Sequence, residues 1–69
     1  MTVRINRQLM REARENAGLS QEGLARQVGV SKNTIQRMET LKGYNVKIQL
    51  LGKVARKIGL LTIDLILED

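Results

Sequence analysis

Four polar side chains are spaced so that they share the outer side of one predicted helix: Lys32, Asn33, Gln36 and Arg37. Ile35 and Met38 recur at helical spacing on the opposite, inner side. Lysine and arginine can donate hydrogen bonds to O6 and N7 of guanine, and an asparagine amide can pair with adenine. The same residue types are common on solvated helix faces, so the surrounding elements must decide between the two interpretations.

The residue types that most enzymes and metal sites need are missing. No Cys and no His occurs in the 69 residues, which removes the usual zinc ligands, the commonest nucleophiles and the commonest general base. The sequence has no Gly-rich phosphate loop, and no pairing for acid–base catalysis is evident among Glu12, Glu15, Glu22 and Glu39. We therefore predict that the chain is not an enzyme and uses no cofactor and no metal.

Positive charge is concentrated in most of the chain. Twelve Lys and Arg against seven Asp and Glu give a net charge of +5. Residues 1–58 hold all twelve bases and four of the acids, a balance of +8, whereas residues 59–69 carry −3. A basic body of this kind suits a polyanion such as nucleic acid, although a solvated basic surface would have the same composition.

The apolar spacing predicts an all-α fold, a compact five-helix domain that takes up residues 1–69. In the first helix the expected apolar stripe is Ile5, Leu9, Ala13 and Ala17. No apolar run is long enough for a membrane span or a secretory signal, so we expect a cytoplasmic protein. The expected helices cover about Thr2–Ala17, Ser20 to Gly29, Ser31 to about Thr40, about Val46–Ile58, and Ile63 to about Leu67 after a Thr62 cap.

The second and third helices are separated by only Gly29 and Val30 before the next cap. Two short helices with such a tight turn must cross steeply. Ala25 is small enough to lie where they touch, and Gly29 gives the turn its backbone freedom. With Ile35 and Met38 as anchors, the second helix of this unit should hold its polar side outward.

This unit resembles the lambda-repressor/Cro/XRE family of bacterial and phage helix-turn-helix regulators. Residues 19–31 read LSQEGLARQVGVS and residues 32–39 read KNTIQRME. The resemblance extends from about Ile5 to Leu67. The positions that match the spacing of the family are Gln21, Ala25, Gly29, Ile35 and Glu39.

The resemblance implies roles for individual residues. The helix from Ser31 to Thr40 would enter the major groove of double-stranded DNA, with base contacts from Lys32, Asn33, Gln36 and Arg37. Tyr44 fits equally well as a cover over the core, and Arg14 with Glu39 would form a structural salt bridge. Contacts to the DNA backbone would come from Gln21, Ser31, Thr34, Lys42, Tyr44 and Lys47.

The sequence departs from the family pattern in three places. Gly23 stands where an acidic residue or alanine is usual, which predicts a softer second helix. The loop Thr40–Val46 lacks the usual proline and looks one or two residues longer. The turn at Leu60 and Leu61 also looks one residue longer.

The C-terminal segment has more apolar residues than one short helix can bury, which predicts a homodimer face; alternatively, these residues complete the core. The predicted function is sequence-specific DNA binding by a dimeric transcriptional regulator, a repressor, with no small-molecule effector. The alternative is a protein-interaction module or an antitoxin-type protein on the same fold. The predicted dimer face comprises Leu61, Ile63, Leu65, Ile66 and Leu67.

Overall fold

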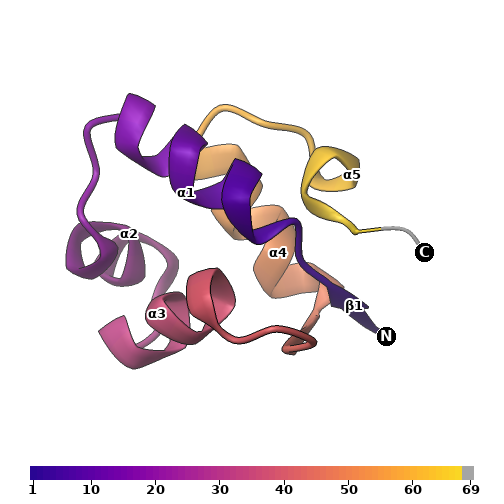
Figure 1. Cartoon of the computed structure of the whole chain (residues 1–69). Coiled ribbons are helices and arrows are strands. Elements are labelled where there is room, and N and C mark those ends of the chain that lie inside the picture. Colours follow the sequence, from indigo (N-terminus) through magenta and orange to yellow (C-terminus); the bar gives the residue numbers. More distant parts are fainter. Residues whose placement is uncertain (68–69) are drawn as a thin grey trace.

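Helices and a short antiparallel sheet surround an aliphatic core in residues 1–67, the part of the chain that the computed structural model describes (Figure 1). These residues form five helices, as predicted, together with a two-stranded sheet. The all-α class is therefore only roughly right. In chain order the elements are β1 (Thr2–Arg4), α1 (Arg7–Asn16), α2 (Gln21–Val28), α3 (Lys32–Thr40), β2 (Asn45–Lys47), α4 (Ile48–Lys57) and α5 (Thr62–Leu65).

The core takes side chains from every helix. Its largest members are fully buried: Met10, Leu24, Ile35, Met38, Leu51, Val54 and Leu65. Helix α2 contacts both α3 and α4, and α1 contacts α3 and α5. The core contains no aromatic side chain from the described residues, but Tyr44 is half-buried against it. Within residues 1–67, no helix is both long and apolar enough to span a bilayer.

The predicted start of the first helix is wrong. Residues Thr2–Arg4 form β1, and α1 begins only at Arg7, after Asn6 accepts a hydrogen bond from the Leu9 amide (3.3 Å) on its side-chain oxygen. The predicted apolar stripe is right in part: Ile5 lies in the core and Leu9 and Ala13 pack against it, but the buried residues of α1 are Met10 and Arg14. Ala17 is exposed.

The fourth and fifth helices are shorter than predicted. Val46 belongs to β2 and α4 starts at Ile48. Helix α5 already starts at Thr62, and it ends at Leu65, because Ile66 forms an extended bridge with Ile5. At its start the Asp64 carboxylate accepts a hydrogen bond from the Leu61 amide (3.0 Å).

Helices α2 and α3 have the predicted positions. Ser20 caps α2 by accepting a hydrogen bond from the Gly23 amide (2.9 Å), and Ser31 caps α3 in the same way for Thr34 (3.2 Å). The structure also gives a local reason for Gly23. A Cβ atom there would lie 3.1 Å from the capping oxygen of Ser20, a tight contact.

Candidate nucleic-acid interface

The turn between α2 and α3 consists of three residues, 29–31. Gly29 has a φ of +79°, a left-handed conformation that glycine adopts without steric cost. The amides of Gly29 and Val30 both donate to the carbonyl of Ala25 (2.9 and 3.0 Å). Because Ile35 and Met38 are fully buried, α3 is anchored along one side and its other side faces solvent.

The four predicted base-contacting residues all lie on the solvent side of α3. Lys32, Asn33, Gln36 and Arg37 are exposed, and the last three line a shallow hollow together with Thr40 and Leu41. Among the described residues, none of these four side chains is engaged in a hydrogen bond or an ion pair. Their donors and acceptors are therefore available to a ligand.

Two predicted backbone-contacting residues belong to the cap of α3. The Ser31 hydroxyl accepts the Thr34 amide and lies 3.1 Å from the Thr34 hydroxyl. Ser31 is exposed and Thr34 is half-buried. A hydroxyl retains acceptor or donor capacity beyond one such bond, so both can still contact a phosphate.

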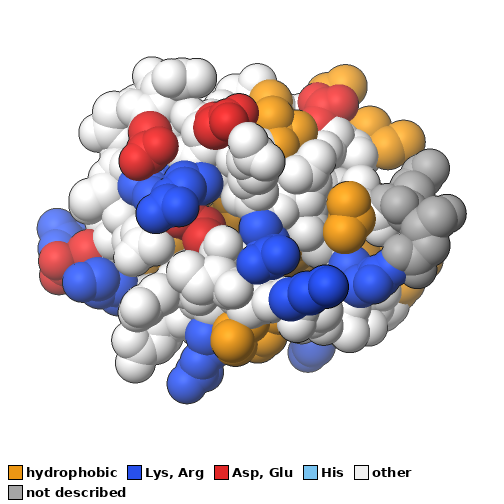
Figure 2. All heavy atoms as spheres, viewed as in Figure 1, with side chains coloured by type: hydrophobic (Ala, Val, Ile, Leu, Met, Phe, Trp, Pro, Cys, Tyr) orange, Lys and Arg blue, Asp and Glu red, His pale blue; other side chains and the backbone are white. Residues whose placement is uncertain are grey.

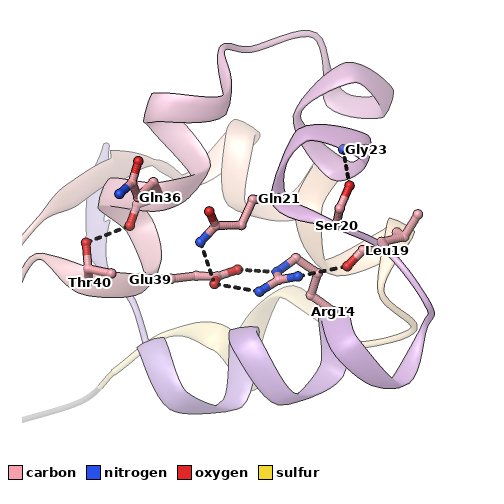
Figure 3. A network of polar contacts seen from close by, with 8 residues as sticks. All are labelled: Arg14, Leu19, Ser20, Gln21, Gly23, Gln36, Glu39 and Thr40. Carbon is pink, nitrogen blue, oxygen red and sulfur yellow. Dashed lines mark hydrogen bonds and ion pairs between the residues drawn. The ribbon is translucent and has the colours of Figure 1, made fainter.

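A buried ion pair joins the end of α3 to α1 (Figure 3). The Arg14 guanidinium donates to both Glu39 oxygens, from Nε to Oε2 (2.6 Å) and from Nη2 to Oε1 (3.0 Å), and from Nη1 to the Leu19 carbonyl (2.8 Å). Exposure of the two side chains is 9% and 1%. The hydrogen bond to Glu39 raises the pKa of Arg14 above its ordinary value, and burial opposes this shift, so the guanidinium stays charged at neutral pH.

Gln21, the predicted phosphate-contacting residue of α2, is part of the same network. Its side-chain Nε2 donates to Glu39 Oε1 (3.1 Å), as Figure 3 shows. An amide nitrogen has two donors, so one N–H remains for another acceptor. The half-buried Gln21 amide is thus held in place by the end of α3, at the N-terminus of α2, where free backbone N–H groups favour an anion.

The loop between α3 and α4 carries the remaining predicted backbone contacts. Lys42 and Lys47 are exposed, whereas Tyr44 is half-buried and packs against the core. Gly43 has a φ of +77°, and the chain then continues into β2. The segment that departs from the family pattern is therefore an ordered turn and strand.

The C-terminal residues divide into two sets. Leu61, Ile63 and Leu67 are exposed, at 70%, 65% and 46%. The assignment of Leu65 to the dimer face was wrong, because its side chain is fully buried in the core. Ile66 is half-buried against the core and contributes little open surface.

Charged and apolar side chains separate on the face shown in Figure 2. Lys and Arg side chains are spread over this face from α1 and α2 to the region of β1, with Asp and Glu side chains among them on the side of α1 and α2, and hydrophobic ones gather around α5. The exposed hydrophobic residues in and next to α5 include Leu61, Ile63 and Leu67. The apolar surface around α5 therefore offers a different kind of contact from the exposed polar side of α3.

Sequence reasoning missed Arg7, which supports α3 from another element. Its Nη1 donates to the carbonyl of Thr40, the last residue of α3 (3.0 Å). An arginine at the C-terminal carbonyls of a helix satisfies an acceptor that has no partner within the helix. The two residues are 33 positions apart, so no local pattern signals the contact.

Comparison with known proteins gives the class of this fold. A family model described as helix-turn-helix matches residues 10–66. The chain belongs to this helix-turn-helix family, of the Cro/CI/XRE type, which confirms the resemblance seen in the sequence. Membership in this family points to a non-enzymatic DNA-binding regulator, in agreement with the prediction from the sequence.

Two curated relatives are archaeal. One, an uncharacterized HTH-type transcriptional regulator of Methanothermobacter thermautotrophicus, is 44% identical over 54 residues, which cover 77% of this chain and 75% of the relative. Another protein with the same description, from Archaeoglobus fulgidus, is 40% identical over 60 residues, covering 87% and 84%. The bacterial or phage setting that the resemblance implied stays a prediction.

Proposed function

We propose that this chain is a sequence-specific DNA-binding transcriptional regulator that reads base edges in the major groove with α3. One observation carries the proposal: within residues 1–67, four polar side chains without a hydrogen-bond or ion-pair partner stand on the open side of a helix whose other side is buried. Membership in the helix-turn-helix family and the description of both relatives as transcriptional regulators support it.

In this proposal the contacts divide between bases and backbone. Lys32 and Arg37 donate to guanine, Asn33 pairs with adenine, and Gln36 offers a further amide. Gln21, Ser31, Thr34, Lys42, Tyr44 and Lys47 contact phosphates and fix the position of α3. Because the Arg14–Glu39 pair holds both Gln21 and the end of α3, the two groups of contacts keep one relative geometry.

We further propose that residues 1–69 act as one module, in the cytoplasm, as a homodimeric repressor. The exposed Leu61, Ile63 and Leu67 support a second copy as the partner, because burying them would remove apolar surface from water. A two-fold dimer would bind half-sites separated by about 10 base pairs or a multiple.

Selection of bound sites from a random duplex pool tests the proposal. We expect enrichment of an inverted repeat at about physiological salt, since phosphate binding is salt-dependent. A single enriched half-site would support base reading without the dimer. A folded protein that enriches no sequence would contradict the proposed function.

Asn33→Ala should weaken binding to the best selected site by about 1–3 kcal/mol and relax the preference at one base pair. The side chain is exposed and makes no hydrogen bond to any described residue, so the substitution should leave the free energy of unfolding almost unchanged. Titrations with matched and single-mismatch duplexes measure the effect. An equal loss on random DNA would rule out a base contact by Asn33.

Gln21→Ala should weaken binding to all sequences alike, because the lost contact is to a phosphate. Gln21 carries no charge, so its loss should not change the salt dependence of binding to random DNA unless a charged contact moves with it. The primary readout is therefore whether the affinity falls equally for all sequences. Since Gln21 also donates to Glu39, urea unfolding must accompany the titration. A loss confined to particular base pairs would argue against the phosphate role.

The alternative function, a protein-interaction module or antitoxin-type protein, is favoured by a different surface. Arg26 of α2 and Lys53, Arg56 and Lys57 of α4 line a basic hollow that shares no residue with α3. Such a hollow suits an acidic protein segment. Simultaneous loss of Lys32, Asn33 and Arg37 would leave that function intact and would abolish DNA reading.

A further inference from the structure

Strand β1 lies between two segments that carry different parts of the proposed function. On one edge it pairs antiparallel with β2, Val3 opposite Val46, and the Ile48 amide donates to the Met1 carbonyl (3.0 Å). On the other edge it meets the C-terminal segment. There the Asn6 amide donates to the Leu65 carbonyl (2.7 Å) and the Leu67 amide donates to the Arg4 carbonyl (2.9 Å).

Alternate residues of the N-terminal segment 1–6 form hydrogen bonds on opposite edges. In an antiparallel ladder, a residue directs its N–H and C=O to the same neighbouring strand. Met1 bonds toward β2, so Val3 does too, whereas Arg4 and Asn6 bond toward the C-terminal segment. Each edge can therefore be broken by a substitution that leaves the other intact.

The two segments that flank β1 carry different residues of the proposed interfaces. The β2 side is continuous with the loop that carries Lys42 and Tyr44, and β2 itself contains Lys47. The C-terminal side follows α5 and includes Leu67, one of the three exposed apolar residues. The first residues of the chain thus connect the proposed backbone-contacting loop to the proposed dimer face.

The pairing is short, so its position depends on packing. An isolated two-stranded ribbon is marginally stable in water. Here Val46 and Ile5 are buried in the core, at 6% and 4% exposure, and Val3 packs beside them. The loop is consequently held by β1 and by the core beneath it, and its own Lys42 and Lys47 stay exposed.

We propose that β1 is a positioning strand: it holds the α3–α4 loop where Lys42 and Lys47 contact the DNA backbone, and it transmits displacements of the C-terminal segment to that loop. This inference rests on the proposed function. It implies that events at the C-terminal face, such as association with a second copy, alter phosphate binding by a loop on the other side of the strand.

Val3→Pro tests the β2 edge, because proline removes the N–H that faces Val46. The variant should bind random-sequence duplex several-fold more weakly, with a log–log salt slope shallower by about one to two units, as expected for one or two lost phosphate contacts. Val3→Ala controls for side-chain packing, and Thr2→Pro controls for proline itself, since the Thr2 N–H faces away from β2. A Val3→Pro protein with the wild-type salt slope would overturn the proposal.

Leu67→Pro tests transmission from the other edge without any DNA. It removes the hydrogen bond to the Arg4 carbonyl, whereas Leu67→Ala shortens the side chain and keeps the N–H. Amide hydrogen exchange at Val46 and Ile48 should become faster in Leu67→Pro than in Leu67→Ala. Equal exchange in the two variants would refute coupling, whereas a wild-type protein without DNA affinity would contradict the proposed function itself.

Discussion

Replacing Glu39 with alanine should lower the free energy of unfolding by about 3–5 kcal/mol, because it leaves the charge of Arg14 buried without its partner. The Arg14 side chain is only 9% exposed and directs two of its donors at Glu39. The loss is large for a small domain, whose total stability is about 5–15 kcal/mol. Urea unfolding of the variant measures it.

The same chain provides a matched control. Glu22 pairs with Arg26 at 3.6 Å, but both side chains are more than half exposed, so Glu22→Ala should change stability by no more than about 0.5 kcal/mol. Replacing both members of the buried pair, Arg14→Met with Glu39→Leu, should recover much of the loss. Equal effects of Glu39→Ala and Glu22→Ala would show that the buried pair does not carry this stability.

Substitution of Glu39 should also weaken DNA binding by the proposed interface. Glu39 accepts the Gln21 amide and closes the end of α3. At temperatures where Glu39→Ala remains folded, its affinity for every DNA sequence should fall. The substitution removes the hydrogen bond that positions the Gln21 amide and the ion pair that fixes the end of α3, so both parts of the interface are displaced. The base preference at Asn33 should persist, since that side chain is independent of the network.

Helices α2 and α3 could be predicted from the sequence because their limits are set locally. Ser20 and Ser31 supply caps within three residues of the amides that they accept, and Gly29 supplies the left-handed turn. The periodic Ile35 and Met38 then determine which side of α3 is buried. Exposure of the four predicted base-contacting residues follows from this one helical phase.

Strand β1 could not be predicted in the same way. Ile5 is four residues before Leu9, so the spacing fits a helix that continues to the N-terminus. The strand is instead determined by partners more than 40 residues away, Val46 on one edge and Ile66 on the other. A buried Arg14 also interrupts the apolar face of α1. Local spacing does not indicate this, because its partner Glu39 lies 25 residues later, and the pair was predicted only from the family resemblance.

The C-terminal segment shows the limit of composition as a guide. Six of the eight residues 60–67 are apolar, which indicates surplus apolar surface but does not say which residue is surplus. The short α5 directs Leu65 into the core and leaves Ile63, two positions earlier, 65% exposed. Only the packing of α5 against α1 and α4 separates the two.

Ile63→Asp should convert the proposed homodimer into a monomer and lower the affinity for an inverted repeat by about 10²–10⁴-fold. This is the range by which linking two binding modules raises avidity. The exposed Ile63 has little core packing to lose, so the folded monomer should tolerate the carboxylate, whereas a second copy would have to bury it without a partner. Sedimentation equilibrium and titration of duplexes with one or two half-sites measure both effects.

Affinity for a single half-site should change far less in Ile63→Asp than affinity for the inverted repeat, and the base preference within the half-site should not change, because within residues 1–67 Ile63 shares no hydrogen bond with α3. Asn16→Asp, at the exposed end of α1, adds the same charge away from α5 and should leave the dimer intact. If Ile63→Asp still sediments as a dimer, the two copies must meet through another surface. If wild-type protein binds one and two half-sites with equal affinity per site, the exposed leucines and isoleucine serve a different partner, and α3 reads DNA as a monomer.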